Sequence, residues 1–262
     1  MLEIFLYCLS FGGLAGLVAG LFGIGGGIIL VPFFLWLFSA RGFSQDVVMH
    51  SAVATSLATI IVTAISSVFA HHRLGSVLWN VVHKLAPGVF IGAVSGAALA
   101  DRLPTETLRL IFACYLLIVS LEMIFQWRPK AEKQHPSSPI LVISGIAIGA
   151  LSSVLGIGGG TLTVPLLTKY GFPIRNAVAI SSACGLPIAI SGSMSFALFG
   201  LGKTGLPDGS IGYVYWPAFL GIVLTSILMA PVGAKLAHRL PTKILKRIFA
   251  GLLFAVSVNM LG

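Results

Sequence analysis

The sequence predicts an all-α polytopic membrane protein made of two inverted-topology repeats, with about eight hydrophobic blocks and as many as ten helical segments. Composition is the first observation behind this, because 57% of the residues are hydrophobic and only 9% are charged. The second is a duplication: the run GIGGG at residues 23–27 recurs at residues 156–160, 133 positions later (156 − 23 = 133), and a Val-Pro pair follows both copies at the same distance. The apolar blocks cover residues 4–38, 47–70, 82–100, 108–127, 139–168, 177–201, 211–234 and 244–261.

The duplication divides the chain into a first transmembrane repeat, residues 1–127, a linker, 128–138, and a second repeat, 139–262. If each glycine-broken block returns to the side from which it entered, twelve of the 16 Lys and Arg residues lie on the side of the linker. The positive-inside rule then places the linker in the cytoplasm and both termini outside. Each repeat crosses the membrane an odd number of times on this interpretation, so the two repeats must be inverted.

Each GIGGG run interrupts a long apolar block, and glycine costs about 1 kcal/mol relative to alanine inside a helix. Such a break persists within a membrane only where protein or a water-filled cavity covers its backbone groups. A half-helix that restarts there presents N–H groups and the positive end of its dipole, which favour an anion. Close packing between helices is the alternative role for these glycines. The predicted substrate-binding glycines are Gly23, Gly25, Gly26, Gly27, Gly156, Gly158, Gly159 and Gly160.

Hydroxyl side chains follow both breaks near the start of the next apolar block. An offset of 130 residues makes Ser51 correspond to Ser181 and Thr55 to Gly185. Neutral donors of this kind bind an oxyanion weakly enough to release it. Hydroxyls in helices also bond to the carbonyl groups of their own preceding turn, which is the alternative role. The predicted hydroxyl ligands are Ser51, Thr55, Ser56, Thr161, Ser181 and Ser182.

Titratable groups are scarce inside the blocks, so coupling to H⁺ and coupling to Na⁺ both stay open. The candidates for a gate or a coupling group are His50, His71, Arg73 and Lys235, and the pair His71-His72 is expected to form a solvated helix end. We expect no cofactor and no metal site, because His, Cys and carboxylate ligands are not clustered. A sodium site made of backbone carbonyls would leave no signature in the sequence.

Other classes of protein fit the sequence poorly. The basic residues lie in short loops without interleaved aromatic residues, so no nucleic-acid partner is expected. An intramembrane hydrolase would need a base beside Ser191 or Ser193, and no histidine lies within that block, so the protein is not expected to be an enzyme. Small residues at Gly12, Gly16 and Gly20 predict a face on which helices approach closely. The block 82–100 is also rich in glycine, at Gly88, Gly92 and Gly96.

Several motifs taken together resemble the sulfite exporter TauE/SafE family over nearly the whole chain. They are GIGGG followed by Val-Pro in both halves, ATSL at residues 54–57, SSACG at 181–185 and APVGAKLAHRLP at 230–241. The resemblance implies an inner-membrane permease for small sulfur-containing anions such as sulfite, sulfoacetate or other sulfonates, working by alternating access with the substrate held at the two breaks. Its expected partners are the anionic substrate, the lipid bilayer and, as an option, a second copy of the chain. An anion channel of the same fold is the alternative.

Overall fold

The computed structural model describes residues 2–22, 26–125, 136–237 and 242–261. In these ranges the first half of the chain forms five helices, α1 Leu2–Phe22, α2 Gly27–Ala40, α3 Val48–Arg73, α4 Trp79–Arg102 and α5 Thr105–Phe125. The second half forms α6 Ser138–Leu155, α7 Gly160–Lys169, α8 Ile174–Phe199, α9 Trp216–Ala237 and α10 Thr242–Leu261, with a short hairpin of β1 Ser210–Ile211 and β2 Val214–Tyr215 before α9.

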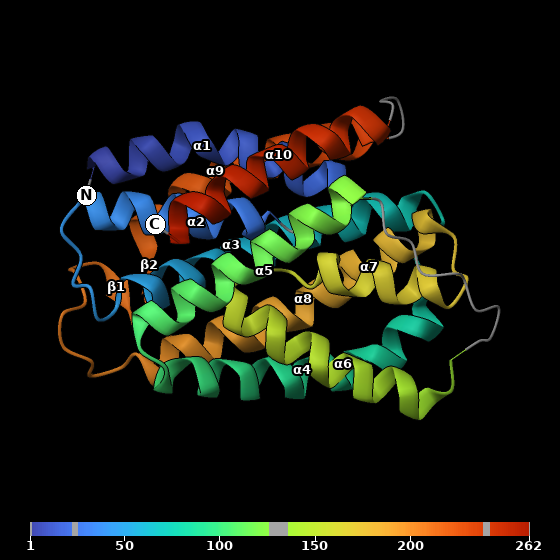
Figure 1. Ribbon diagram of the computed structural model, residues 1–262, viewed down its shortest axis with the longest axis horizontal. Helices are drawn as coiled ribbons and strands as arrows, with labels where there is room; N and C mark the ends of the chain where they lie inside the picture. The colour runs from blue at the N-terminus through green and yellow to red at the C-terminus, as the bar shows by residue number, and fades with distance from the viewer. Residues whose placement is uncertain (1, 23–25, 126–135, 238–241, 262) are drawn as a thin grey trace.

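The helices run along one common axis (Figure 1). Both termini lie at one end of the molecule, which we call the terminal end, whereas α5 ends and α6 begins at the opposite end, the linker end (Figure 1). Each half contains an odd number of described helices, and α6 runs opposite to α1 in the same view. This is the arrangement that two inverted repeats would have, and the inversion itself stays a prediction.

The two halves interleave and do not form separate bodies. α1 packs along α9, α4 along α6, α5 along α10 and α3 along α8. α1 and α6 are the first helices of their halves, and α4 and α9 are the fourth. The first helix of each half therefore packs along the fourth helix of the other, so the same packing occurs twice, as a duplicated sequence predicts. The glycine faces explain the close approach, because Gly12 and Gly16 pack on the backbone of α9 and Gly88, Gly92 and Gly96 pack on that of α6.

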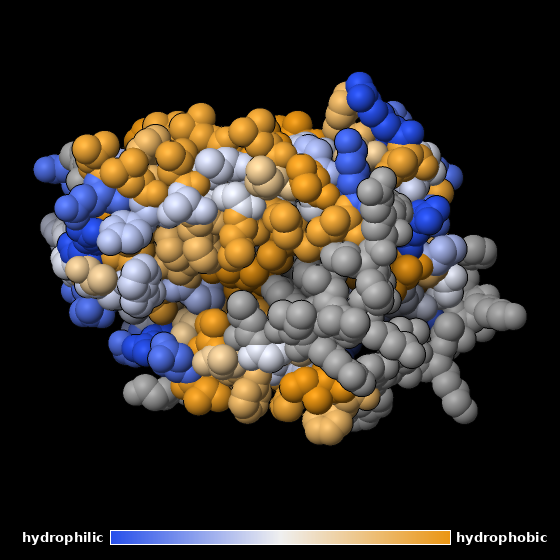
Figure 2. Space-filling model, turned by 90° about the horizontal axis from the view of Figure 1, so that it is seen from above, coloured by the Kyte–Doolittle hydropathy of each residue, from blue (hydrophilic) through white to orange (hydrophobic). Residues whose placement is uncertain are grey.

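Figure 2 shows hydrophobic surface over the middle of the molecule and hydrophilic residues gathered at its two ends. Within the described residues, six helices, α1, α3, α4, α6, α8 and α9, are long and apolar enough to cross a bilayer. α3 and α8 are the most buried of them, because 67% and 72% of the residues in their apolar 18-residue windows are buried. These two helices therefore form the centre of the bundle. The prediction of an all-α polytopic membrane protein is confirmed.

α2 and α7 are too short to cross a bilayer alone. They contain 14 and 10 residues, whereas a spanning helix needs about 20. Each begins beside a glycine break and runs back toward the end from which the preceding helix came (Figure 1). The broken blocks are therefore helical hairpins with one long arm and one short arm.

Candidate functional site

The two glycine breaks meet in the centre of the bundle. A Cβ atom added to Gly27 would stand 2.4 Å from the carbonyl oxygen of Gly156 and 2.9 Å from the Cα of Ile157. On α8, a Cβ at Gly185 would stand 2.9 Å from the carbonyl oxygen of Gly158. Because only a hydrogen atom fits in these spaces, Gly27 brings the backbones of the two halves into direct contact, and Gly185 brings α8 into contact with the break of its own half.

Left-handed glycines shape both restarts. Gly26, with φ 80°, precedes α2, and Gly159, with φ 73°, precedes α7. Gly156, with φ 68°, ends α6, and the N–H of the next residue, Ile157, donates to the carbonyl of Ser152 at 2.9 Å. Side chains other than glycine are disfavoured in this conformation. Gly160 is the buried first residue of α7, while Gly23 and Gly25 lie outside the described residues.

The hydroxyl groups mostly hold the framework of the site together. Ser56 Oγ on α3 donates to the carbonyl oxygen of Gly156 at 2.8 Å, so one half of the chain binds the break of the other. Thr55 Oγ1 accepts the backbone N–H of Tyr215 at 3.0 Å. Ser182 Oγ donates to the carbonyl of Val178, one turn earlier in its own helix, at 3.0 Å. For Ser182 the alternative role, a bond within its own helix, is the one observed.

In the described part of the chain, the other three predicted hydroxyl ligands, Ser51, Ser181 and Thr161, do not bond to the backbone of the bundle. Ser51 and Ser181 are fully buried, and their Oγ atoms have no hydrogen-bond partner among the described residues. Thr161, on the first turn of α7, is hydrogen-bonded to the hydroxyl of Tyr115 from α5. Tyr115 thus brings a third helix to the second break, and sequence reasoning missed it because a lone tyrosine in an apolar block reads as a packing residue.

The helix boundaries correct the predicted correspondence between the halves. α3 begins at Val48 and α8 at Ile174, an offset of 126 (174 − 48 = 126) and not 130. The offset falls from 133 at the breaks because α7 is shorter than α2 and because the next connection covers residues 170–173 where the first half uses 41–47.

A groove of about 810 Å³ follows α2 between α1, α5 and α10. It reaches from Ala40 at the terminal end to Ile28, the residue beside Gly27. Ile28 and Ser39 are eleven residues apart on this helix, which gives the groove a length of about 16 Å. It is therefore long enough to lead from the surface of the molecule to the first glycine break.

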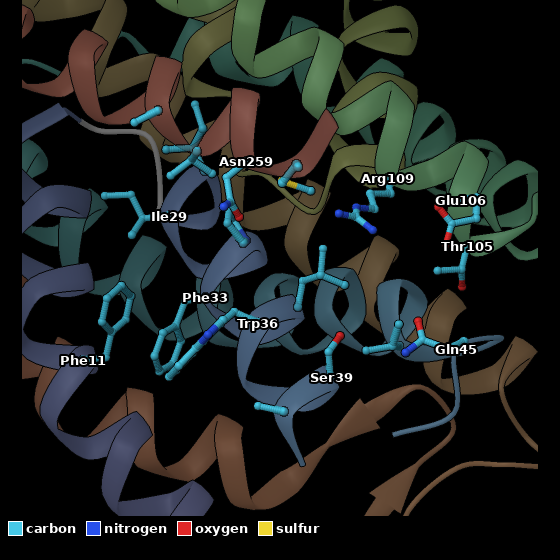
Figure 3. A pocket seen from close by; sticks show the side chains of 18 of the residues that line it. Phe11, Ile29, Phe33, Trp36, Ser39, Gln45, Thr105, Glu106, Arg109 and Asn259 are labelled. Carbon is cyan, nitrogen blue, oxygen red and sulfur yellow. The ribbon is translucent and has the colours of Figure 1, made fainter. Parts of the chain in front are cut away.

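The groove has an aromatic side and a polar side (Figure 3). Phe11, Phe33 and Trp36 line the aromatic side, where the rings of Phe11 and Phe33 stack with centroids 3.8 Å apart. The polar side consists of the hydrophilic side chains of the lining, which are Ser39, Gln45, Thr105, Glu106, Arg109 and Asn259. Glu106 is the one carboxylate among them.

Arg109 is the one cation in the lining of this groove. Its Nε atom is buried and has no hydrogen-bond partner among the described residues. Arg109 lies in the second turn of α5, inside the apolar block 108–127, and it was not among the predicted site residues. The signal in the sequence that could have identified Arg109 as a site residue is that a basic residue lies inside the first two turns of an apolar helix.

His50, proposed as a coupling residue, lies near the terminal end under the loop that carries β1 and β2. Its ring stacks on that of Tyr213 with centroids 5.1 Å apart, and its Nε2 is 3.1 Å from the carbonyl oxygen of Ala100. Tyr213 donates to Asp101 Oδ1 at 2.9 Å, and Lys203 is paired with the same oxygen at 3.1 Å. Burial, followed by the bond to Asp101, raises the pKa of Tyr213 above its ordinary value, so the phenol keeps its proton and donates at neutral pH.

The other gate candidates lie at the linker end or at a helix terminus. His71 is buried, which corrects the expectation that both histidines of the pair are solvated; His72 and Arg73 are exposed. The Arg73 guanidinium lies over the ring of Phe69, 4.2 Å from its centroid. Lys235 is exposed in the last turn of α9. None of the four candidates, His50, His71, Arg73 and Lys235, lines the groove.

Ser56→Ala is expected to lower stability by about 1–3 kcal/mol, because the buried carbonyl of Gly156 would lose its donor. Thermal unfolding of the purified protein in detergent measures this loss. Ser95→Ala is the control: Ser95 is also a serine of a membrane helix, but its hydroxyl donates within its own helix, to the carbonyl of Gly92 at 2.8 Å, and among the described residues it binds no group of the other half. Equal melting temperatures for the two variants would show that the bond to Gly156 contributes nothing.

Comparison with known proteins identifies the family. The model of the family described as sulfite exporter TauE/SafE matches residues 8–260. The chain belongs to the sulfite exporter TauE/SafE family. The TauE/SafE assignment confirms the resemblance inferred from the repeated motifs.

Relatives of the chain carry the same general description. It is 39% identical to a probable membrane transporter protein of Haemophilus influenzae, over 99% of both chains. It is 26% identical to a probable membrane transporter protein of Methanocaldococcus jannaschii, over 95% of this chain and 92% of the relative. The probable membrane transporter protein YunE of Bacillus subtilis is 24% identical over 98% and 97%. No solved structure matches. This TauE/SafE protein is thus a membrane transporter.

Proposed function

We propose that the protein is a secondary transporter that moves small sulfur-containing oxyanions, such as sulfite or a sulfonate, across the inner membrane by alternating access. The observation that carries this proposal is the groove that leads from the terminal end to Ile28, with the guanidinium of Arg109 on its polar side. Arginine binds oxyanions through paired N–H groups, and these bonds are stronger than those between neutral groups. Asn259 and Gln45 add neutral donors on the same side.

At its inner end the groove meets the first turn of α2. The N–H groups of Ile29 and Leu30 both donate to the carbonyl of Gly26 at 3.1 Å. The N–H groups of the residues before them, Gly27 and Ile28, are the first of the helix, and such groups lack partners inside the helix. A helix start of this kind attracts an anion through its dipole and its amides. An anion that passes Arg109 therefore encounters a second favourable group at the break.

The contact between the breaks favours a transporter over a channel. Gly27 and Gly156 lie in direct contact, so an anion cannot pass between the halves while this contact holds. Opening on one side and closing on the other requires the two hairpins to move relative to each other, as in other transporters with broken helices. In the alternative, an anion channel of the same fold, the path would be open to both sides at once.

Uptake of labelled sulfite and of a labelled sulfonate into proteoliposomes, with and without a pH gradient, tests the proposal. We expect uptake that saturates with substrate concentration for at least one of the two anions. Uptake that rises linearly and at channel rates would favour the channel, and the absence of uptake for both anions would contradict the proposed substrate class.

Arg109→Gln is expected to raise the KM for the transported anion about 10- to 100-fold, because a hydrogen bond to a charged group contributes about 1.5–3 kcal/mol. Arg102→Gln is the matched control, since Arg102 is an exposed residue of the same end of the molecule and is not part of the groove lining. An unchanged KM for Arg109→Gln, or the same rise in both variants, would remove the groove from the transport path.

A further inference from the structure

A second, much smaller cavity lies where α1, α3 and α8 meet the second glycine break. It measures about 10 Å³, which is the room that about one water-sized particle requires. Its polar lining consists of Thr63 and Ser67 on α3, Ser182 on α8 and the backbone of Gly158. All three side chains are buried, with exposed fractions of 2%, 7% and 5%. The cavity is separate from the groove, with which it shares no lining residue.

The hydroxyl hydrogens of this cavity are already directed to other atoms. Ser67 Oγ donates to Ser182 Oγ at 3.2 Å, and Ser182 Oγ donates in turn to the carbonyl of Val178 at 3.0 Å. Thr63 Oγ1 donates to the carbonyl of Ile60 at 3.2 Å. A hydroxyl has a single hydrogen, so the capacity that Ser67 Oγ and Ser182 Oγ retain consists of lone pairs. The cavity is therefore lined by acceptors and suits a cation and not an anion.

Backbone groups add to this polarity. A Cβ at Gly185 would stand 2.9 Å from the carbonyl oxygen of Gly158, so that oxygen faces α8, where the cavity lies. Ala19, which also lines the cavity, belongs to the last turn of α1. The last four carbonyl groups of a helix lack partners within it and form the negative end of its dipole. The last turn of α1 and the backbone of the second break thus approach the same small space.

The chemistry of the lining selects among cations. The lining contains no carboxylate, histidine, lysine or arginine, so it has no group that could carry a transported proton. Calcium and magnesium sites in proteins depend on carboxylate oxygens. Neutral hydroxyl and carbonyl oxygens at a broken helix are the ligands by which transporters bind Na⁺.

We propose that this cavity is a sodium site and that Na⁺ is the coupling ion, an inference that rests on the proposed transport of an anion. The lining comes from α1 and α3 of the first half and from α8 and the break of the second. A cation bound here holds together the same interface at which Gly27 contacts Gly156. Sodium thereby favours the state in which the breaks are closed, which is how an ion in one cavity is linked to an anion in another.

Thermal unfolding of the purified full-length protein, in detergent and without any transported anion, tests the sodium site. We expect NaCl to raise the melting temperature saturably, relative to KCl and choline chloride at equal ionic strength. Ser67→Ala and Thr63→Val are expected to weaken the apparent sodium affinity at least about tenfold, which corresponds to the loss of about 1.4 kcal/mol of binding free energy. Equal melting temperatures in the three salts would show that the cavity holds only water and would overturn the proposal.

Ser191→Ala is the matched control. Ser191 is also a buried serine of α8 and donates to the carbonyl of Pro187 at 2.7 Å, but it does not line the cavity. We expect this variant to keep the full response to sodium, and loss of that response would also count against the site. If a cavity variant fails to fold, the comparison of salts with the unaltered protein still decides the question.

Transport assays separate failure of this inference from failure of the proposed function. Saturable anion uptake that is the same in an inward Na⁺ gradient and in an inward K⁺ gradient would retain the transporter and exclude sodium coupling. A sodium-dependent rise in melting temperature without uptake of sulfite or sulfonate would retain the site and exclude the proposed substrates. We expect the Na⁺ gradient to accelerate uptake and Ser67→Ala to abolish that acceleration.

Discussion

Gly27→Ala is expected to reduce transport at least about tenfold while the protein still inserts into the membrane, a loss equivalent to about 1.4 kcal/mol or more. The reason is steric. The added Cβ would stand 2.4 Å from the carbonyl oxygen of Gly156, a backbone atom that cannot turn aside as a side chain can. The two breaks would have to separate, and the carbonyl that accepts the hydrogen bond from Ser56 would move with them.

The control for this variant is Gly251→Ala. Gly251 is also a helical glycine, but among the described residues no atom of a neighbouring segment lies within 4 Å of the position that its Cβ would take. Initial rates of uptake into proteoliposomes, normalised to the amount of inserted protein, provide the comparison. Wild-type uptake by the Gly27 variant would show that the contact between the breaks has no part in transport.

Gly159→Ala distinguishes steric contact from backbone strain. At Gly159 the nearest atom to an added Cβ is the terminal Cδ1 of Ile188, at 2.8 Å, and a flexible side-chain end can move away. The remaining cost is that of a non-glycine residue at φ 73°, about 1–2 kcal/mol. We therefore expect uptake by the Gly159 variant to lie between that of the Gly27 variant and that of the wild type.

Gly92→Ala is expected to have the largest effect on stability, about 3 kcal/mol or more, in the upper range for an overpacked contact. Its Cβ would stand 2.1 Å from the carbonyl oxygen of Ile146, so α4 and α6 would have to separate along their whole contact. Gly88 and Gly96, one turn to either side, oppose the backbone of α6 in the same way. The melting temperature in detergent and the fraction of monodisperse protein measure the effect.

Gly13→Ala is the matched control for Gly92→Ala. Its nearest neighbour is the side-chain Cγ of Met229 at 3.7 Å, an ordinary van der Waals distance. Alanine is a better helix former than glycine by about 1 kcal/mol, so the control is expected to be neutral or slightly more stable. A Gly92 variant as stable as this control would mean that α4 and α6 do not depend on a glycine face.

Much of the fold follows from the sequence because it depends on local composition. Long apolar blocks become membrane-spanning helices, and four glycines in five residues end a helix wherever they occur. The breaks at residues 23–27 and 156–160, and the glycine face of α1, were predicted on this basis. α2 begins at Gly27 and α7 at Gly160, so the described helices start where the repeated motif predicts.

The partners of the site residues did not follow from the sequence. The predicted offset of 130 residues differs from the 126 residues that separate the starts of α3 and α8, because the length of α7 and of the connection after it differs from that of the first half. His71 proved to be buried, and Arg109, which was not among the predicted site residues, proved to line the groove. These outcomes depend on how each helix is rotated, which hydropathy alone does not specify.

By itself, the sequence determined that this is a duplicated helical membrane protein of the TauE/SafE family, and where its helices break. Only the tertiary structure decided what meets at the breaks. Ser56 binds Gly156 across 100 positions and Thr55 binds Tyr215 across 160, while the groove and the small cavity each combine helices from both halves. Helix formation and membrane insertion are local properties of a segment, whereas these contacts arise from the packing of interleaved helices and exist only when both halves are folded together.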